Sequence, residues 1–101
     1  MPIETLYVSK NILTGTLPDQ LYNMPLQTFV CSDNSFSGTI SQKIERMYDL
    51  EVLKIAKNLF SGSIPDGILE TNLTIALLNQ NHLNGTLSEF IGDMVDMGEY
   101  L

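Results

Sequence analysis

The sequence has one cysteine and few basic residues, and each shortage excludes a kind of site or partner. A single cysteine has no partner for an internal disulfide and cannot form a four-cysteine zinc site. Five Lys and Arg residues against twelve Asp and Glu give a net charge of −7, and neither Lys nor Arg occurs from Asn58 to Leu101. We therefore do not expect a nucleic-acid partner, because a phosphate-binding surface needs clustered basic side chains.

Long apolar runs are also missing. No stretch approaches the ~20 apolar residues that a membrane span requires, and the first ten residues lack the basic and apolar regions of a signal peptide. The 101 residues suit one domain. An apolar share of 44% is too high for a disordered acidic tail. The sequence therefore predicts one folded domain over residues 1–101.

An internal repeat runs through almost the whole chain. Asn recurs at positions 11, 34, 58 and 81, and glycine follows each of them four residues later. Large apolar residues follow each Asn by two residues, and aliphatic residues follow it by six and ten. Further apolar residues precede it by three, five and eight. A fixed period of this kind indicates a repeat architecture. The repeats span approximately 3–25, 26–49, 50–72 and 73–95, with 96–101 as a partial repeat or a tail.

Each column of the repeat has a physical reason. The apolar alternation before Asn predicts a short strand, and strands this short are stable only when stacked. The Asn side chain carries two donors and an acceptor, so we expect stacked Asn residues to bind backbone groups where the chain leaves the sheet. Glycine permits an unusual backbone conformation, and proline starts the next segment with a fixed φ.

These columns resemble the leucine-rich repeat, in its plant-specific form LxxLxLxxNxLxGxIPxxLxxLxx. The segments VLKIAKNLFSGSIPDGI and TLYVSKNILTGTLPDQL fit closely, whereas TISQKI and TLSEFI carry Ser in place of Pro. The resemblance implies an α/β-type repeat solenoid: a right-handed coil with a short parallel β-sheet on its concave face and loose helical turns on its convex side. It also implies a noncatalytic protein-binding module, part of a receptor-like or adhesive chain.

In this fold the strand residues between the aliphatic columns face outward on the concave side. We therefore expect these residues to form the protein-binding surface: Tyr7, Lys10, Val30, Asp33, Val52, Lys54, Lys57, Ile75, Leu77, Asn79 and Gln80. Val30, Val52, Ile75 and Leu77 would form an exposed apolar patch, which marks many interaction sites but also occurs on ordinary surfaces. Lys10, Asp33 and Lys57 would form a ladder of alternating charge, which either serves partner recognition or only keeps like charges apart.

Small polar residues bracket each glycine and predict a second outward ladder of two columns, in which equivalent residues such as Thr14 and Ser37 are neighbours. Its members are Thr14, Thr16, Ser37, Thr39, Ser61, Ser63, Asn84 and Thr86. A regular array of hydroxyl groups resembles an ice-binding surface, which gives a third functional hypothesis. The alternative is that this repeat type prefers small polar residues beside its glycine.

No residues with catalytic, metal-binding or cofactor-binding spacing stand out. His82 is the single histidine and falls in the predicted turn after Asn81, where we expect it to be solvated. Cys31 occupies an inward column, so it should be buried and inert. We expect neither enzyme activity nor a cofactor.

Two Asn-x-Thr triplets begin at Asn72 and Asn84 and could carry glycans in a secretory pathway. They favour an extracellular or secretory location only slightly. The cysteine-pair caps of extracellular members are missing, so we expect core columns to be uncovered at both ends, including Leu6, Val8 and Leu13 at one end and Leu78 and Leu83 at the other. A second functional hypothesis follows, a structural subunit packed within a larger assembly or between further repeats.

Overall fold

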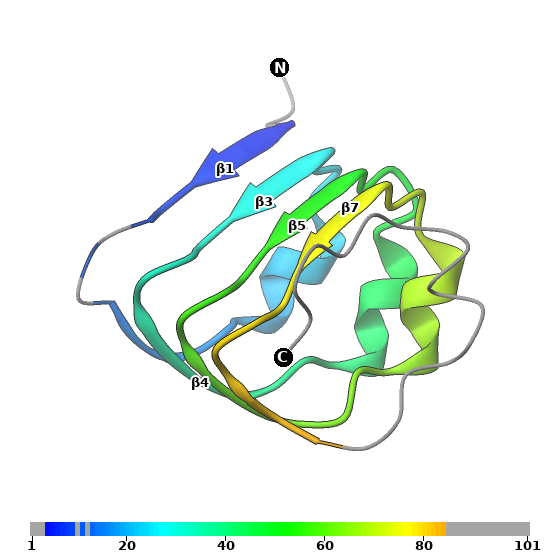
Figure 1. Cartoon of the computed structure of the whole chain (residues 1–101). Coiled ribbons are helices and arrows are strands. Elements are labelled where there is room, and N and C mark those ends of the chain that lie inside the picture. The colour runs from blue at the N-terminus through cyan, green and yellow to red at the C-terminus, as the bar shows by residue number, and fades with distance from the viewer. Residues whose placement is uncertain (1–3, 10, 12, 85–101) are drawn as a thin grey trace.

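The computed structural model describes residues 4–9, 11 and 13–84, and these form a coil of stacked rungs (Figure 1). Each rung holds a strand, a second strand after a turn, and, in three rungs, a short 3₁₀ helix (η). In chain order the elements are β1 (Thr5–Tyr7), β2 (Thr14–Thr16), η1 (Asp19–Asn23), β3 (Thr28–Val30), β4 (Ser35–Thr39), η2 (Gln42–Arg46), β5 (Val52–Lys54), β6 (Leu59–Gly62), η3 (Asp66–Glu70), β7 (Ile75–Leu77) and β8 (His82–Leu83).

All strand pairs are parallel. One sheet has the order β1-β3-β5-β7 and the other has the order β2-β4-β6-β8. In Figure 1 the first sheet lies on one side of the coil and the 3₁₀ helices lie across from it. The predicted solenoid, with a parallel sheet and loose helical turns, is therefore confirmed.

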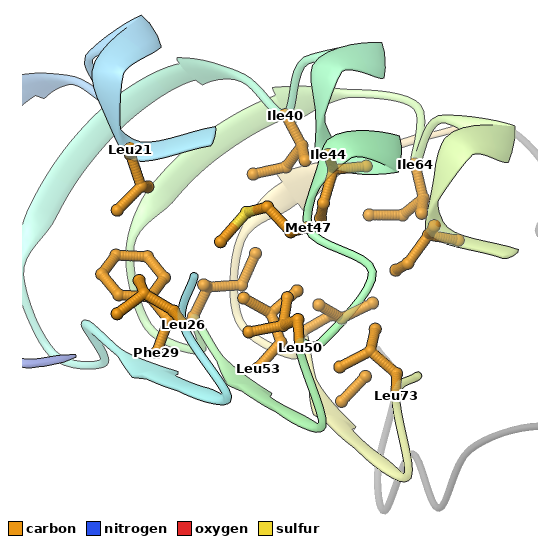
Figure 2. Packing of buried hydrophobic residues seen from close by; sticks show 14 of the residues in the cluster. Leu21, Leu26, Phe29, Ile40, Ile44, Met47, Leu50, Leu53, Ile64 and Leu73 are labelled. Carbon is orange, nitrogen blue, oxygen red and sulfur yellow. The ribbon is translucent and has the colours of Figure 1, made fainter. Parts of the chain in front are cut away.

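The core fills the space between the sheet and the helical turns. Leu26 and Leu50 are fully buried, Leu73 is nearly so, and all three precede strands of the first sheet at equivalent positions. Figure 2 shows side chains of both sides, such as Phe29 from β3 and Ile44 from η2, pointing into this shared interior. Burial of each such side chain contributes about 1.5–3 kcal/mol, so the inward columns of the repeat hold the rungs together.

The predicted asparagine ladder is present. Asn58 is buried, and its Nδ2 donates to the carbonyls of Ile55 and Ala56 in its own rung and to Cys31 O of the previous rung at 2.9 Å. Its Oδ1 accepts from the Phe36 amide of the previous rung. Asn34 and Asn81 repeat the same arrangement. The side chains therefore satisfy backbone groups at the point where each strand of the first sheet ends.

The serine that replaces proline in the second repeat keeps the same backbone conformation. Ser41 has φ −74° and ψ 147°, close to the −73° and 148° of Pro18 and the −71° and 147° of Pro65. Its hydroxyl also accepts a hydrogen bond from the Lys43 amide at 3.0 Å. This bond occupies a free amide at the start of η2, so the substitution preserves the turn.

The polar ladder of the second sheet differs from the expectation. We expected Thr14 beside Ser37, but the register pairs Thr14 with Ser35 and Thr16 with Ser37. The same offset of two residues places Thr39 beside Ser61. Each described glycine of this column has a left-handed backbone, for example φ +84° at Gly38, in the segments where this offset occurs. The hydroxyl groups consequently form staggered pairs rather than two straight columns, and Thr86 lies outside the described residues.

Cys31 is fully buried, as its inward column predicts. Burial raises the pKa of the Cys31 thiol from 9.0 to about 12. We therefore expect a thiol reagent at pH 8 to modify the folded chain at least about 100-fold more slowly than the chain in denaturant, because the thiolate is the reactive form. Labelling at equal rates in the two states would contradict the placement of Cys31 in the core.

The raised pKa also fixes the sign of a pH effect. The unfolded thiol loses its proton near pH 9, whereas the folded thiol keeps it until about pH 12. The folded state therefore binds the proton more tightly, and the contribution of this group to stability falls as the pH rises through that window.

Candidate protein-binding face

The outer face of the first sheet carries the candidate binding residues. Successive residues of a strand point to opposite faces, and the middle residues Phe29, Leu53 and Ala76 are buried in the core. The residues on either side of them therefore point outward. Tyr7 of β1 is 64% exposed on this face. Strand pairing places the outer residues in two straight rows: Thr5, Thr28, Val52, Ile75, and Tyr7, Val30, Lys54, Leu77.

The expected apolar patch is smaller than the sequence indicated. Val52, Ile75 and Leu77 are half-buried, but Val30 is only 5% exposed. The prediction that Val30 is exposed is therefore wrong. Val30 is paired directly with Tyr7 on one side and Lys54 on the other, and these longer side chains flank it at the spacing of about 4.8 Å between strands.

The charged ladder beside the patch is present in the part that the structure describes. Lys57 Nζ lies 3.9 Å from Asp33 Oδ1, with both side chains partly exposed. Such a pair in contact with solvent contributes at most about 1 kcal/mol to stability. Lys10, the third expected member, lies outside the described residues.

The end of each described rung of this face has a conformation that the sequence pattern did not reveal. Asp33, Lys57 and Gln80 all have positive φ values, 59°, 57° and 56°. Non-glycine residues seldom adopt this left-handed region. This left-handed conformation turns the chain from the first sheet toward the second. It also fixes the direction of the three side chains at the edge of the outer face. Asn79, next to Gln80, is half-buried.

The remaining candidates lie away from this face. Asn72 is exposed between η3 and β7, and Asn84 is exposed after β8. His82 is exposed as expected, although it lies in the short strand β8, paired with Ser61, rather than in a turn. In residues 4–9, 11 and 13–84, no three His, Cys, Asp or Glu side chains gather into a group that could hold a metal ion. None of the helices in this part of the chain has the length and apolar character that crossing a membrane requires.

Hollows lie at two places away from the outer face of the first sheet. A polar one of about 80 Å³ lies between the segments that follow η1 and η2, beside Arg46 and Tyr48. A larger one of about 240 Å³ opens at the β1 end of the coil, and its exposed lining is entirely apolar, from residues such as Leu6, Leu13 and Leu17. Spacing alone gives no sign of the polar hollow, because it depends on how neighbouring rungs cover one another, whereas the apolar hollow lies where Leu6 and Leu13 were expected to be uncovered. Leu78, which we expected to be uncovered at the opposite end, is 1% exposed, so that expectation is wrong.

The comparisons with known proteins agree with this geometry. The family model described as Leucine Rich Repeat matches residues 2–24. The plant peptide hormone receptor RGFR1, solved in complex with RGF2, is similar over 94% of the chain at 26% identity and a TM-score of 0.86. The chain has the leucine-rich-repeat fold. A chain of the BIR3–SERK2 complex from Arabidopsis thaliana is similar over 89% of the present chain, at 28% identity and a TM-score of 0.79.

A plant ice-binding protein shares the fold at 22% identity and a TM-score of 0.85, over 95% of the chain. No curated protein matches the sequence. The chain spans only 16% of the RGFR1 structure, 50% of the matched chain in the BIR3–SERK2 complex and 34% of the ice-binding protein. The likeness therefore concerns a few rungs of longer arrays.

Proposed function

We propose that this leucine-rich-repeat chain is a noncatalytic module that binds a peptide or protein segment along the outer face of its first sheet. The exposed aromatic ring of Tyr7, which stands in one row with Lys54 and Leu77, is the observation that carries the proposal. Tyrosine is enriched among the residues that dominate binding energy. Half-buried aliphatic side chains on β5 and β7 of the same face, Val52, Ile75 and Leu77, supply apolar area at low cost in conformational freedom.

The comparisons support the same kind of partner. RGFR1 is a peptide hormone receptor solved in complex with RGF2. The BIR3–SERK2 structure is a complex of two proteins. By extension we propose a receptor-like role and an extracellular location for this chain, where Asn72 and Asn84 would be accessible to glycosylation. The ice-binding hypothesis has weaker support, because that likeness concerns the fold alone and the hydroxyl groups of β2, β4 and β6 are staggered.

Two tyrosines give a matched test of the binding face. Tyr7 on β1 and Tyr48 after η2 are exposed to similar extents, 64% and 70%, but only Tyr7 belongs to the sheet face. Peptides enriched from a random displayed library on the purified chain serve as probes. We expect Tyr7→Ala to weaken the dissociation constant of these peptides at least tenfold, equal to about 1.4 kcal/mol, and Tyr48→Ala to leave it unchanged.

The measurement is fluorescence anisotropy with the labelled peptides. A loss of affinity in Tyr48→Ala with none in Tyr7→Ala would place the binding site on the side of the helical turns. Circular dichroism of both variants shows whether either substitution disturbs the fold. We expect unchanged spectra, because both side chains are exposed.

A further inference from the structure

The second repeat is one residue longer than its neighbours, and the extra residue lies in the turn after η2. The interval from Asn34 to Asn58 is 24 residues, whereas the other two intervals between the repeated asparagines are 23. Between the residue that caps each helix and the buried leucine that begins the next rung, one residue stands after η1 and after η3. Two residues, Tyr48 and Asp49, stand after η2. The turn after η2 therefore cannot have the shape of the other two.

The extra residue widens this turn. In the first rung the Leu26 amide donates to Met24 O, two residues back, at 2.9 Å, whereas the Leu50 amide donates to Met47 O, three residues back, at 3.0 Å. Met47 has ψ 58°, against 139° at Met24. The wider turn carries Tyr48 away from the core, and 70% of this residue is exposed.

The polar hollow of about 80 Å³ lies where this wider turn meets the turn of the first rung. The helices leave room for it. In Figure 1 η2 and η3 lie side by side, and they approach closely at Gly67, where a Cβ atom would lie 2.8 Å from Gln42 O. The helix η1 packs less closely against η2, and the longer side chains of Asp19 and Lys43 join the two, with Lys43 Nζ 2.8 Å from Asp19 Oδ2.

Arg46 supplies the positive charge of the hollow. Its Nη1 donates to Asn23 Oδ1 at 3.3 Å, which holds the guanidinium beside the hollow. A guanidinium carries five N–H donors, so Arg46 can donate to a second group. It belongs to neither of the two ion pairs found among the described residues, although the exposed carboxylate of Asp49 also lines the hollow. Charges of opposite sign thus border one small space without pairing across it.

We propose that this hollow is a docking site for an acidic side chain, Asp or Glu, of a partner protein. The carboxylate accepts from Arg46, whose planar fork of N–H groups matches two carboxylate oxygens. A segment of a partner also packs against the exposed ring of Tyr48, which lines the hollow, and a free carboxylate ion lacks this contact. The site lies at the ends of η1 and η2, so it does not rest on the peptide binding proposed for the outer face of the first sheet.

The size and charge of the hollow favour a carboxylate over other ligands. Pockets for small molecules usually have volumes of about 300–1,000 Å³, whereas about 80 Å³ corresponds to roughly three water molecules and takes only the tip of a side chain. Asp49 disfavours a group with more than one negative charge. A phosphate carries about two at pH 7, and a carboxylate carries one.

Displayed peptides that require Arg46 test the identity of the occupant. A random library is depleted on the Arg46→Gln variant and then enriched on the wild-type chain, which removes peptides that bind elsewhere. We expect the recovered peptides to share an Asp or Glu at one position. Its replacement by Asn or Gln should raise the dissociation constant at least about tenfold.

Matched variants test the two charges. Arg46→Gln should raise the dissociation constant of these peptides at least about tenfold, and Asp49→Asn, which removes the like charge, should lower it about threefold. Lys43→Gln is the control, because Lys43 lies on the same helix but is paired with Asp19 and does not line the hollow. It should change the dissociation constant by less than about twofold. The exposed positions of Arg46 and Asp49 predict unchanged circular dichroism.

Recovered peptides without a shared acidic residue would overturn the proposal, and so would a failure to recover any. An equal loss of affinity in Lys43→Gln and Arg46→Gln would reduce the effect to net charge and would also overturn it. Binding of acetate alone, followed by the amide shifts of Tyr48 and Asp49, would show an ion site without a docking partner. Tyr48→Ala should weaken these peptides and Tyr7→Ala should not, so the proposal fails or holds separately from the binding face of the first sheet.

Discussion

Replacement of Asn58 by alanine is expected to lower the free energy of unfolding by about 2–4 kcal/mol. The substitution removes the bond from the Phe36 amide to Oδ1, and a buried amide that loses its partner costs about 1–3 kcal/mol. It also removes the bonds from Nδ2 to the carbonyls of Cys31, Ile55 and Ala56. These carbonyls lose less, because each keeps another donor: Asn34 Nδ2 at 3.0 Å, Asn81 Nδ2 at 2.9 Å and the Asp33 amide at 3.1 Å, respectively. Against a typical total of ~5–15 kcal/mol, this loss is large.

Asn11 provides the matched control. It occupies the same column but is exposed, and among the residues that the structure describes it bonds only within its own rung. Asn11→Ala should therefore cost less than about 1 kcal/mol, since water can bind the carbonyls that it leaves. Urea titrations of both variants measure the difference. Equal losses would show that the ladder does not draw its stability from burial between rungs.

Phe60→Ala is the second substitution with a large expected effect. Phe60 is fully buried, and its ring stacks on Phe36 with the centroids 6.3 Å apart. Truncation of a buried Phe to Ala removes its apolar contacts, leaves a cavity and costs about 3–5 kcal/mol. We expect a loss of this size in the same urea titrations.

Leu13 tests the same column at its open end. Because 41% of this side chain is already exposed, Leu13→Ala should cost less than half as much as Phe60→Ala. A loss for Leu13→Ala as large as that for Phe60→Ala would mean that the first rung is covered as completely as the third.

The sequence predicted the fold because each column of the repeat has one physical task. The spacing of Asn34, Asn58 and Asn81 placed three polar side chains at the ends of successive strands, and their hydrogen bonds follow that placement. The column of Cys31 and Ile55 was assigned to the core, and both residues are fully buried. Such assignments need only the period of the repeat and the alternation of a strand.

The details that escaped the sequence depend on neighbours rather than on columns. Val30 has the outward orientation that its column predicts, yet Tyr7 and Lys54 flank it and it is buried. Thr14 pairs with Ser35 instead of its repeat equivalent Ser37, because the second sheet is staggered. Exposure and register are set between rungs, where side-chain size and backbone twist decide the outcome, and a column of similar residues does not record them.

The most direct test of the binding face is a chemical-shift titration. The ¹⁵N-labelled chain is titrated with a peptide enriched from the displayed library, and the backbone amide shifts are followed by NMR. The binding proposal predicts that the largest changes occur in β1, β3, β5 and β7, centred on Tyr7 and Lys54. Changes concentrated in η1, η2 and η3, with the strands of the first sheet unaffected, would contradict it.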